Sequence, residues 1–246
     1  MLSYKCSAEC KHCMYACSPK WKGDWITKEK LEEGLPILAR YIKPSPYGHE
    51  NMSLNHGLHF SGGEPFLNFE LLLKAVEIAE ALRIPSTFVE TNCFWCKDDT
   101  FTQNRLQRLK EKGLKGIMIS VNPFYPAKSS FNIPCQPPIL RNWHNHFDNY
   151  GNFMPGFCGG ISLGSWFDLD RLVKEGVDLE KRPILQYLIN DDMKELLHIA
   201  KHIEYKEISD GYVSKCHLCL DIRKHLSARS NFEELNPKEF YEQLKI

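Results

Sequence analysis

The chain has 246 residues, of which 43% are hydrophobic and 25% are charged, as in ordinary folded proteins. Its 31 lysines and arginines equal its 31 aspartates and glutamates, so no overall basic field would attract nucleic acid. No apolar run is long enough to cross a bilayer, and the segment before Cys6 is too short for a signal peptide. We therefore expect a cytoplasmic protein that contacts neither nucleic acid nor membrane.

The chain opens with a stretch of about 25 residues that shows neither a helical nor a strand period. Its mixture of Cys, Lys, Ser and Gly predicts an ordered loop. A helix capped by Thr27 and running to Lys43 is expected next, because apolar residues recur there at helical spacing. A short strand over residues 57–61 follows.

Strands and helices then alternate. Asn68 is expected to cap a helix that runs to Leu82, and a strand rich in β-branched and aromatic residues follows over 86–91. A helix over about 100–112 precedes the near-continuous apolar segment 116–121, which is typical of a parallel strand covered on both faces. This order predicts βαβ units, a parallel sheet and an α/β fold.

The alternation ends after Pro123. Residues 126–165 are irregular and rich in proline and aromatic residues, and the pattern from 166 onward is helical. We expect helices over about 168–175, 178–189, 192–203 and 216–228, and a last one with Asn236 as cap and Pro237 in its first position. The expected regions are a core over 1–125, an irregular segment over 126–165 and a helical extension over 166–246.

Three cysteines, Cys6, Cys10 and Cys13, form a CxxxCxxC motif in the opening loop. Thiolates are the usual ligands of iron–sulfur clusters, and three of them leave one iron of a four-iron cluster open for chemistry. A structural zinc, with Cys17 as the fourth ligand, is the alternative.

A second motif, Ser61-Gly-Gly-Glu-Pro65, directly follows the strand expected over 57–61. Two adjacent glycines allow the backbone to approach a ligand closely, because no Cβ intervenes. The carboxylate of Glu64 would suit an ammonium group.

Together these motifs resemble the radical S-adenosylmethionine (radical SAM) superfamily, with Cys6, Cys10 and Cys13 as its cluster loop and Gly62, Gly63 and Glu64 as its GGE segment. The resemblance implies a partial (βα) barrel with a truncated first strand, and a 4Fe–4S cluster whose open iron binds the amino and carboxylate groups of SAM. The GGE segment would hold the same amino group. Reductive cleavage of SAM would then give a 5′-deoxyadenosyl radical that takes hydrogen from a substrate.

Polar residues end the next two expected strands, where the family places contacts to SAM. Thr91 and Asn92 follow one strand, and Ser120 and Asn122 follow the other. In parallel βα barrels the active site lies at this carboxyl-end face. Ordinary turn chemistry is the alternative for each residue taken alone.

Late cysteines resemble the ligands of the auxiliary cluster that many radical SAM enzymes carry. Cys158, Cys216 and Cys219 form this set, and Cys135 is a candidate fourth ligand. A structural zinc, or reduced cysteines without metal, are the alternatives.

The resemblance also implies an electron donor such as a flavodoxin or ferredoxin. It leaves the substrate unknown; the late cysteines favour peptide or protein modification, with activation of a glycyl-radical enzyme or a small-molecule reaction as alternatives. Two other interpretations stay open. One is a truncated or degenerate relative without activity, and the other is a zinc-binding α/β binding protein.

Overall fold

The computed structural model describes residues 1–10, 13–120, 135–140, 145–156, 158–212 and 214–244. The chain forms two compact units. The first holds residues 1–9, 17–123 and 147–151, and the second holds 10–16, 124–146 and 152–246. Cys6 therefore belongs to the first unit, whereas Cys10 and Cys13 belong to the second.

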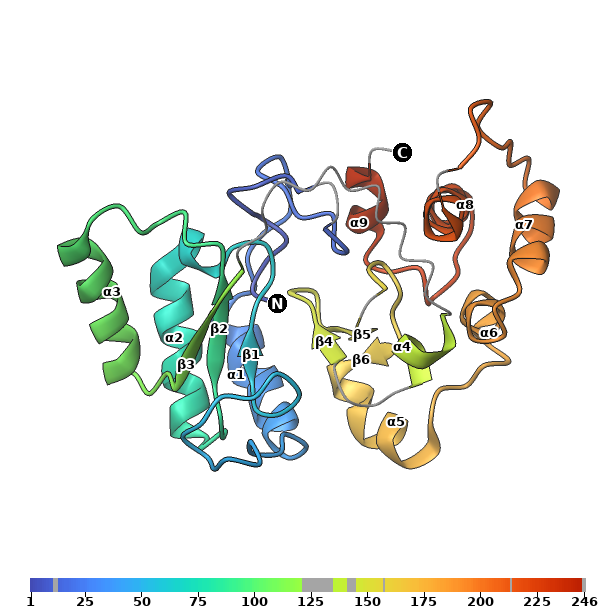
Figure 1. Ribbon diagram of the computed structural model, residues 1–246. Coiled ribbons are helices and arrows are strands. Elements are labelled where there is room, and N and C mark those ends of the chain that lie inside the picture. Colours follow the sequence, from blue (N-terminus) through green and yellow to red (C-terminus); the bar gives the residue numbers. More distant parts are fainter. Residues whose placement is uncertain (11–12, 121–134, 141–144, 157, 213, 245–246) are drawn as a thin grey trace. The chain divides into compact units, whose positions relative to one another are not determined.

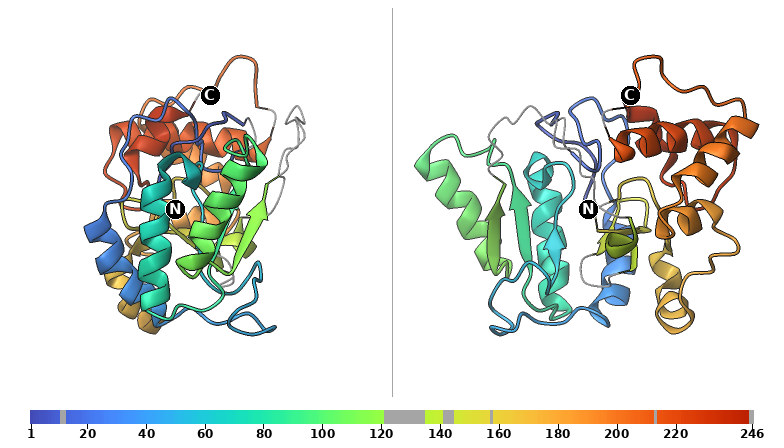
Figure 2. Two further views of the ribbon diagram at one scale, coloured as in Figure 1. Left: turned by 90° about the vertical axis from the view of Figure 1, so that its left-hand side faces the viewer. Right: turned by 45° about the vertical axis from the view of Figure 1, so that its right-hand side comes forward.

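The first unit is built on a three-stranded parallel sheet in the order β1-β2-β3 (Figure 1). The strands are β1 (His59–Phe60), β2 (Phe88–Thr91) and β3 (Gly116–Ile119). The helices are α1 (Lys28–Ala39), α2 (Phe69–Ala81) and α3 (Asp99–Glu111), and the 3-10 turn η1 (Pro65–Asn68) leads into α2. Helices α2 and α3 lie side by side on one face of the sheet (Figures 1 and 2). The mixed α/β class and the parallel sheet are confirmed.

Side chains cap each of these helices at its first turn. Thr27 accepts a hydrogen bond from the backbone N–H of Lys30, and Asn68 accepts one from Leu71, as the sequence predicts. Helix α3 begins slightly earlier than expected, because Asp98 accepts from the N–H of Phe101. The apolar stripes of α1 and α2 are buried, which fixes both helices on the sheet.

The second unit combines a small sheet with helices. The sheet has the order β4-β5-β6, with β4 (Asn145–Phe147), β5 (Asn152–Pro155) and β6 (Gly164–Ser165), and β5 and β6 are antiparallel. The last residue of β4, Phe147, is counted with the first unit. The helices are α4 (Gln136–Leu140), α5 (Leu169–Glu175), α6 (Pro183–Ile189), α7 (Met193–His202), α8 (Lys215–Arg229) and α9 (Lys238–Gln243), with the 3-10 turn η2 (Trp166–Asp168) before α5. The helical character predicted after residue 166 is thus present.

Two features of this unit differ from the expectation. The small sheet was not predicted, because its strands, unlike β1 to β3, do not lie in apolar runs that alternate with expected helices. The cap of the last helix was predicted one residue too early. Pro237 itself is the cap, with an extended backbone (φ −72°, ψ 150°), and a proline's φ suits either position.

None of the helices in the described ranges is both long and apolar enough to cross a membrane. The described residues hold three parallel strands, and a closed or partial barrel stays a prediction.

Candidate functional site

The two glycines of the GGE segment pack directly against the start of the chain. A Cβ on Gly62 would lie 2.3 Å from the carbonyl oxygen of Ser3, and one on Gly63 would lie 1.8 Å from that of Lys5. Backbone hydrogen bonds hold this approach, with Gly63 N–H donating to Ser3 at 2.8 Å and Glu64 N–H donating to Lys5 at 2.9 Å. The chain's own packing therefore requires both glycines, whereas the sequence suggested a ligand as the reason.

The carboxylate of Glu64 links the end of β1 to the end of β2. Only 1% of this residue is exposed. Its Oε1 accepts from the N–H of Phe66 (3.1 Å) and the hydroxyl of Thr91 (2.9 Å), and its Oε2 accepts from the N–H of Asn92 (2.8 Å). Burial raises the pKa of Glu64 above its ordinary value, although these hydrogen bonds oppose the shift. Glu64 thus fixes the turn that carries Asn92.

The hydroxyl of Thr91 makes three hydrogen bonds in the same turn. Its hydroxyl donates to Glu64 and accepts from the backbone N–H of Cys93 (3.1 Å) and the indole N–H of Trp95 (2.9 Å). A hydroxyl has one proton and two lone pairs, so these contacts use its whole capacity. The side chain of Thr91 therefore holds the turn in place and has no hydrogen-bonding capacity left for a ligand.

Asn92 brings an amide group to the first cysteine of the motif. Its Nδ2 lies 3.8 Å from the Sγ of Cys6 and 3.0 Å from the hydroxyl oxygen of Ser7. The backbone N–H of Ala8 donates to the same sulfur at 3.4 Å. Two N–H groups therefore point at a buried thiol, and such donors stabilise a metal-bound thiolate. Ser7 and Ala8 carry no signal by which the sequence would have revealed this role.

Of the two predicted ribose contacts, Ser120 lies within the described residues and Asn122 does not. The N–H of Ser120 donates to the carbonyl of Thr91 at 2.9 Å, which places Ser120 beside the Thr91–Asn92 turn. Asn122 lies outside the described residues, as does His12 within the cysteine motif.

Cys10 and Cys13 occupy consecutive turns in the second unit. Cys13 N–H donates to the carbonyl of Cys10, and Ala16 N–H donates to that of Cys13, both at 3.1 Å. Cys10 is exposed and Cys13 is half-buried. Partial burial, and secondarily the neighbouring Cys13, raise the pKa of the Cys10 thiol. The backbones of Cys10 and Cys13 are thus in direct contact, which suits neighbouring cluster ligands.

The late cysteines gather in the second unit around helix α8. Cys216 and Cys219 lie three residues apart on α8, so they share one face of that helix. Burial raises the pKa of Cys216, and the neighbouring Cys158 adds to the rise. Burial also raises the pKa of Cys219 to about 12, with smaller contributions from Cys158 and Cys135. The sequence-predicted set and its candidate fourth member are therefore electrostatic neighbours.

Four thiols in one region match the donor set of an iron–sulfur cluster. Within the described part of the chain, no three His, Cys, Asp or Glu side chains lie close enough to share a single ion. In a four-iron cluster each thiolate binds a different iron, so its ligands lie farther apart than those around one zinc. The thiols of this region are thus candidate metal ligands.

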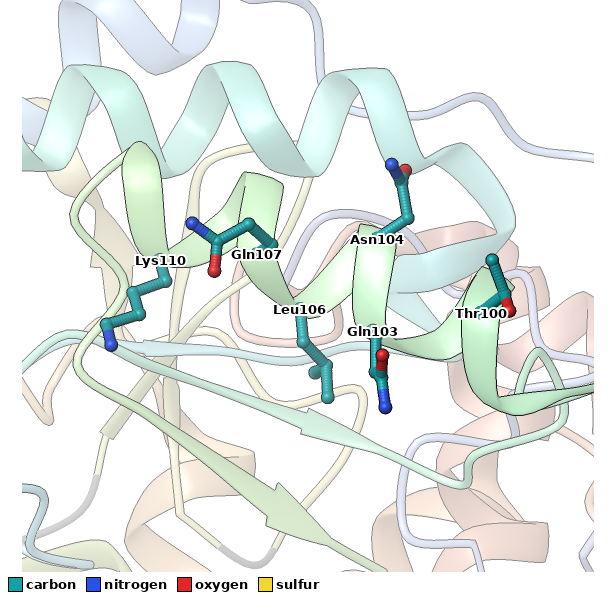
Figure 3. A pocket seen from close by; sticks show the side chains of 6 residues that line it. All are labelled: Thr100, Gln103, Asn104, Leu106, Gln107 and Lys110. Atoms are coloured by element: carbon teal, nitrogen blue, oxygen red, sulfur yellow. The ribbon is translucent and has the colours of Figure 1, made fainter.

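A shallow pocket lies elsewhere in the first unit, along the outer face of α3 (Figure 3). All of its lining residues come from that one helix, and none was predicted to act in the site: Thr100, Gln103, Asn104, Leu106, Gln107 and Lys110. It offers no converging polar groups of the kind that a cofactor site needs.

Comparison with known proteins agrees with the cysteine motif. Residues 1–122 match the family described as the 4Fe–4S single cluster domain. The GTP 3′,8-cyclase of Aquifex aeolicus (strain VF5) is 31% identical over 133 residues, which are 52% of this chain and 35% of that protein. The chain thus spans about a third of the length of that curated relative. Residues 1–122 are thus similar to the 4Fe–4S single cluster domains, which confirms the resemblance of this segment to the radical SAM superfamily.

Proposed function

We propose that this chain is a radical SAM enzyme whose 4Fe–4S cluster is held by Cys6, Cys10 and Cys13. The observation that carries the proposal is the pair of N–H donors, from Ala8 and Asn92, at the sulfur of Cys6. Such donors would offset the negative charge of a cluster thiolate.

Cys6, Cys10 and Cys13 would hold a cluster that would supply the electron for reductive cleavage of SAM to methionine and a 5′-deoxyadenosyl radical, and this radical would take hydrogen from the substrate. The chain's own residues position these groups. Glu64 holds the Thr91–Asn92 turn in place, and Asn92 orients toward Cys6. Backbone groups of Gly62 and Gly63 are the proposed contacts for the amino group of SAM.

The hydrogen bonds of the buried Glu64 carboxylate limit how many further groups it can bind. Its carboxylate already accepts three hydrogen bonds within the chain, and a carboxylate has about four lone-pair sites. One site remains for an ammonium group. The strand-end residues Ser120 and Asn122 complete the proposed set, as contacts to the ribose of SAM.

We also propose a second iron–sulfur cluster on Cys158, Cys216 and Cys219, with Cys135 as its candidate fourth ligand. The mutual electrostatic influence of these thiols supports it. The proposed partners are SAM, an electron donor such as a flavodoxin or ferredoxin, and an unidentified substrate. A second cluster favours a peptide or protein substrate over a small molecule.

The test is anaerobic reconstitution with iron and sulfide, followed by measurement of 5′-deoxyadenosine released from SAM under dithionite. Wild type is compared with the Cys6/Cys10/Cys13→Ala variant. Cys96→Ala is the control, because it removes an exposed cysteine of the first unit that lies outside the motif. We expect release by wild type and the control and none by the triple variant.

The other interpretations give different results. Iron uptake by wild type without SAM cleavage would identify a degenerate relative that binds a cluster and catalyses nothing. A colourless wild type that binds zinc and takes up no iron would identify a zinc-binding protein. A triple variant that cleaves SAM as well as wild type would overturn the ligand assignment.

A further inference from the structure

Arg223 is a buried cation on the cysteine-bearing face of α8. It lies four residues after Cys219 and seven after Cys216, so all three side chains project from one stripe of the helix. Only 2% of Arg223 is exposed. Its Nη1 donates to the carbonyl of Gly159 at 3.0 Å and to the hydroxyl oxygen of Tyr241 at 3.1 Å. Because Gly159 follows Cys158, the guanidinium lies among all three predicted ligands.

Within the described part of the chain, the interactions given for Arg223 include no carboxylate that would balance its charge. Among the described residues its neighbours are a carbonyl, a tyrosine hydroxyl and the thiols of Cys158 and Cys219, and its Nε is buried without a hydrogen-bond acceptor. Arginine stays protonated even when it is buried. A buried cation without an anionic partner costs several kcal/mol in real proteins. Neutral thiols do not offset that cost, whereas thiolates bound to a cluster would.

Arg182 provides a contrast within the same unit. It is also buried, at 9% exposure, and donates to the carbonyl of Ser162 at 3.1 Å. Its guanidinium, however, lies 3.8 Å from the carboxylate of Glu233. Arg182 therefore has a carboxylate beside it, whereas Arg223 has cysteines.

We propose that Arg223 is the counter-charge of the second cluster, placed by α8 and α9 to balance the thiolates of Cys158, Cys216 and Cys219. The inference rests on the proposed second cluster and adds the residue that tunes it. Arg223 is a positioning residue: its guanidinium is an electrostatic neighbour of the Cys219 thiol, and its charge would raise the cluster's reduction potential. A positive charge beside a cluster favours the reduced form, which carries one more electron.

A packing role for Arg223 predicts a different pattern of stability. If Arg223 only ties the Gly159 loop to α9, its loss lowers stability equally with and without iron. If it is a counter-charge, Arg223→Met removes an unbalanced charge from the iron-free protein but leaves the loaded cluster without compensation. The sign of the effect on the thermal midpoint then depends on loading.

The experiment uses the full chain carrying Cys6/Cys10/Cys13→Ala, so that iron reports the second site alone. Arg223→Met and Arg223→Lys are compared with Arg182→Met as the control. Iron and sulfide per chain, thermal midpoints before and after loading, and the midpoint potential from an EPR-monitored titration are measured. For Arg223→Met we expect an unchanged or raised midpoint without iron, a lowered one with iron, and about 10–100-fold weaker iron retention against a chelator.

The potential of Arg223→Met should also become more negative, whereas Arg223→Lys should stay closer to the parent protein. Arg182→Met should lower both thermal midpoints alike and leave the potential unchanged. Equal losses with and without iron, at an unchanged potential, would overturn the counter-charge role while leaving the second cluster in place. A parent protein that takes up no iron would overturn both, without touching the first cluster.

Discussion

At the residue scale, Asn92 is the side chain whose loss should affect the first cluster most selectively. Its backbone N–H donates to Glu64, and this hydrogen bond is kept in both Asn92→Asp and Asn92→Ala. Its side-chain amide faces the sulfur of Cys6. Asn92→Asp has nearly the same shape, but it replaces an N–H donor by an anionic oxygen. The repulsion between that oxygen and a thiolate should weaken the cluster.

The measurement is iron retention in a chain carrying Cys158/Cys216/Cys219→Ala, so that only the first site reports. We expect Asn92→Asp to weaken retention by about 10–100-fold, the usual effect of changing a group that supports a metal ligand. Asn92→Ala should have a smaller effect, because it removes the donor without adding charge. Equal retention by the Asp variant and its parent would show that the amide does not support Cys6.

Some residues of the site could be predicted from the sequence, whereas the reason for others could not. The cysteine motif and Glu64 were identified from local motifs, and Asn92 from its place at a strand end in the family resemblance; the structure joins Cys6, Glu64 and Asn92 by hydrogen bonds. The reason for Gly62 and Gly63 was not visible, since their partners Ser3 and Lys5 lie about 60 residues away in the chain. Long-range backbone contacts leave no periodic trace, so a ligand was the simpler inference.

At the scale of elements, Glu234 secures the start of helix α6. Its Oε1 accepts from the N–H of Ile184 at 2.9 Å, in the first turn of the helix. It is fully buried, and its Oε2 has no hydrogen-bond partner among the described residues. Burial raises the pKa of Glu234 above its ordinary value. The carboxylate is therefore a costly cap in its ionised form.

This burial predicts a pH dependence of stability. Between the ordinary pKa of about 4.3 and the raised one, the folded chain keeps a proton that the unfolded chain has lost. The free energy of unfolding therefore falls as pH rises through that window. Glu234→Gln keeps an oxygen for Ile184 and carries no charge, so its stability should rise relative to wild type over the same window.

Thermal or urea unfolding from pH 4 to pH 8 checks this prediction. Glu234→Ala should lose about 0.5–2 kcal/mol, as capping residues do. Glu233→Gln is the control, because it removes the neighbouring charge at an exposed position. A difference between wild type and Glu234→Gln that does not vary with pH would refute the argument.

Elements differ in how well their sequences specify them. Helices α1 and α2 were predicted with their caps, because an apolar stripe and a capping side chain mark each one locally. Strands β1 to β3 were located by short apolar runs between helices. The sheet of β4, β5 and β6 was missed, since its strands lie in an irregular segment without apolar runs and depend on pairing rather than on pattern.

At the scale of the whole molecule, the two units differ in how they can hold themselves together. The first has a parallel sheet covered by helices of 12 or 13 residues. In the second, α5, α6 and α9 have only six or seven residues. Helices shorter than about 12 residues are marginal without tertiary contacts. A cluster on cysteines of the second unit would supply such contacts, because metal binding adds its free energy to folding.

Hydrogen–deuterium exchange should therefore respond to the two sets of cysteines in different places. In reconstituted protein, Cys158/Cys216/Cys219→Ala should raise exchange in α8, in α9 and around Gly159, and leave β2 and α2 protected. Cys6/Cys10/Cys13→Ala should raise it mainly in the loop after Cys6 and around Asn92, whose amide binds that loop. Exchange that rises equally throughout the chain in either variant would mean that cysteine loss unfolds the protein as one body. Loss of exchange protection in α8 and α9 alone would instead show that the second unit depends on its own metal for order.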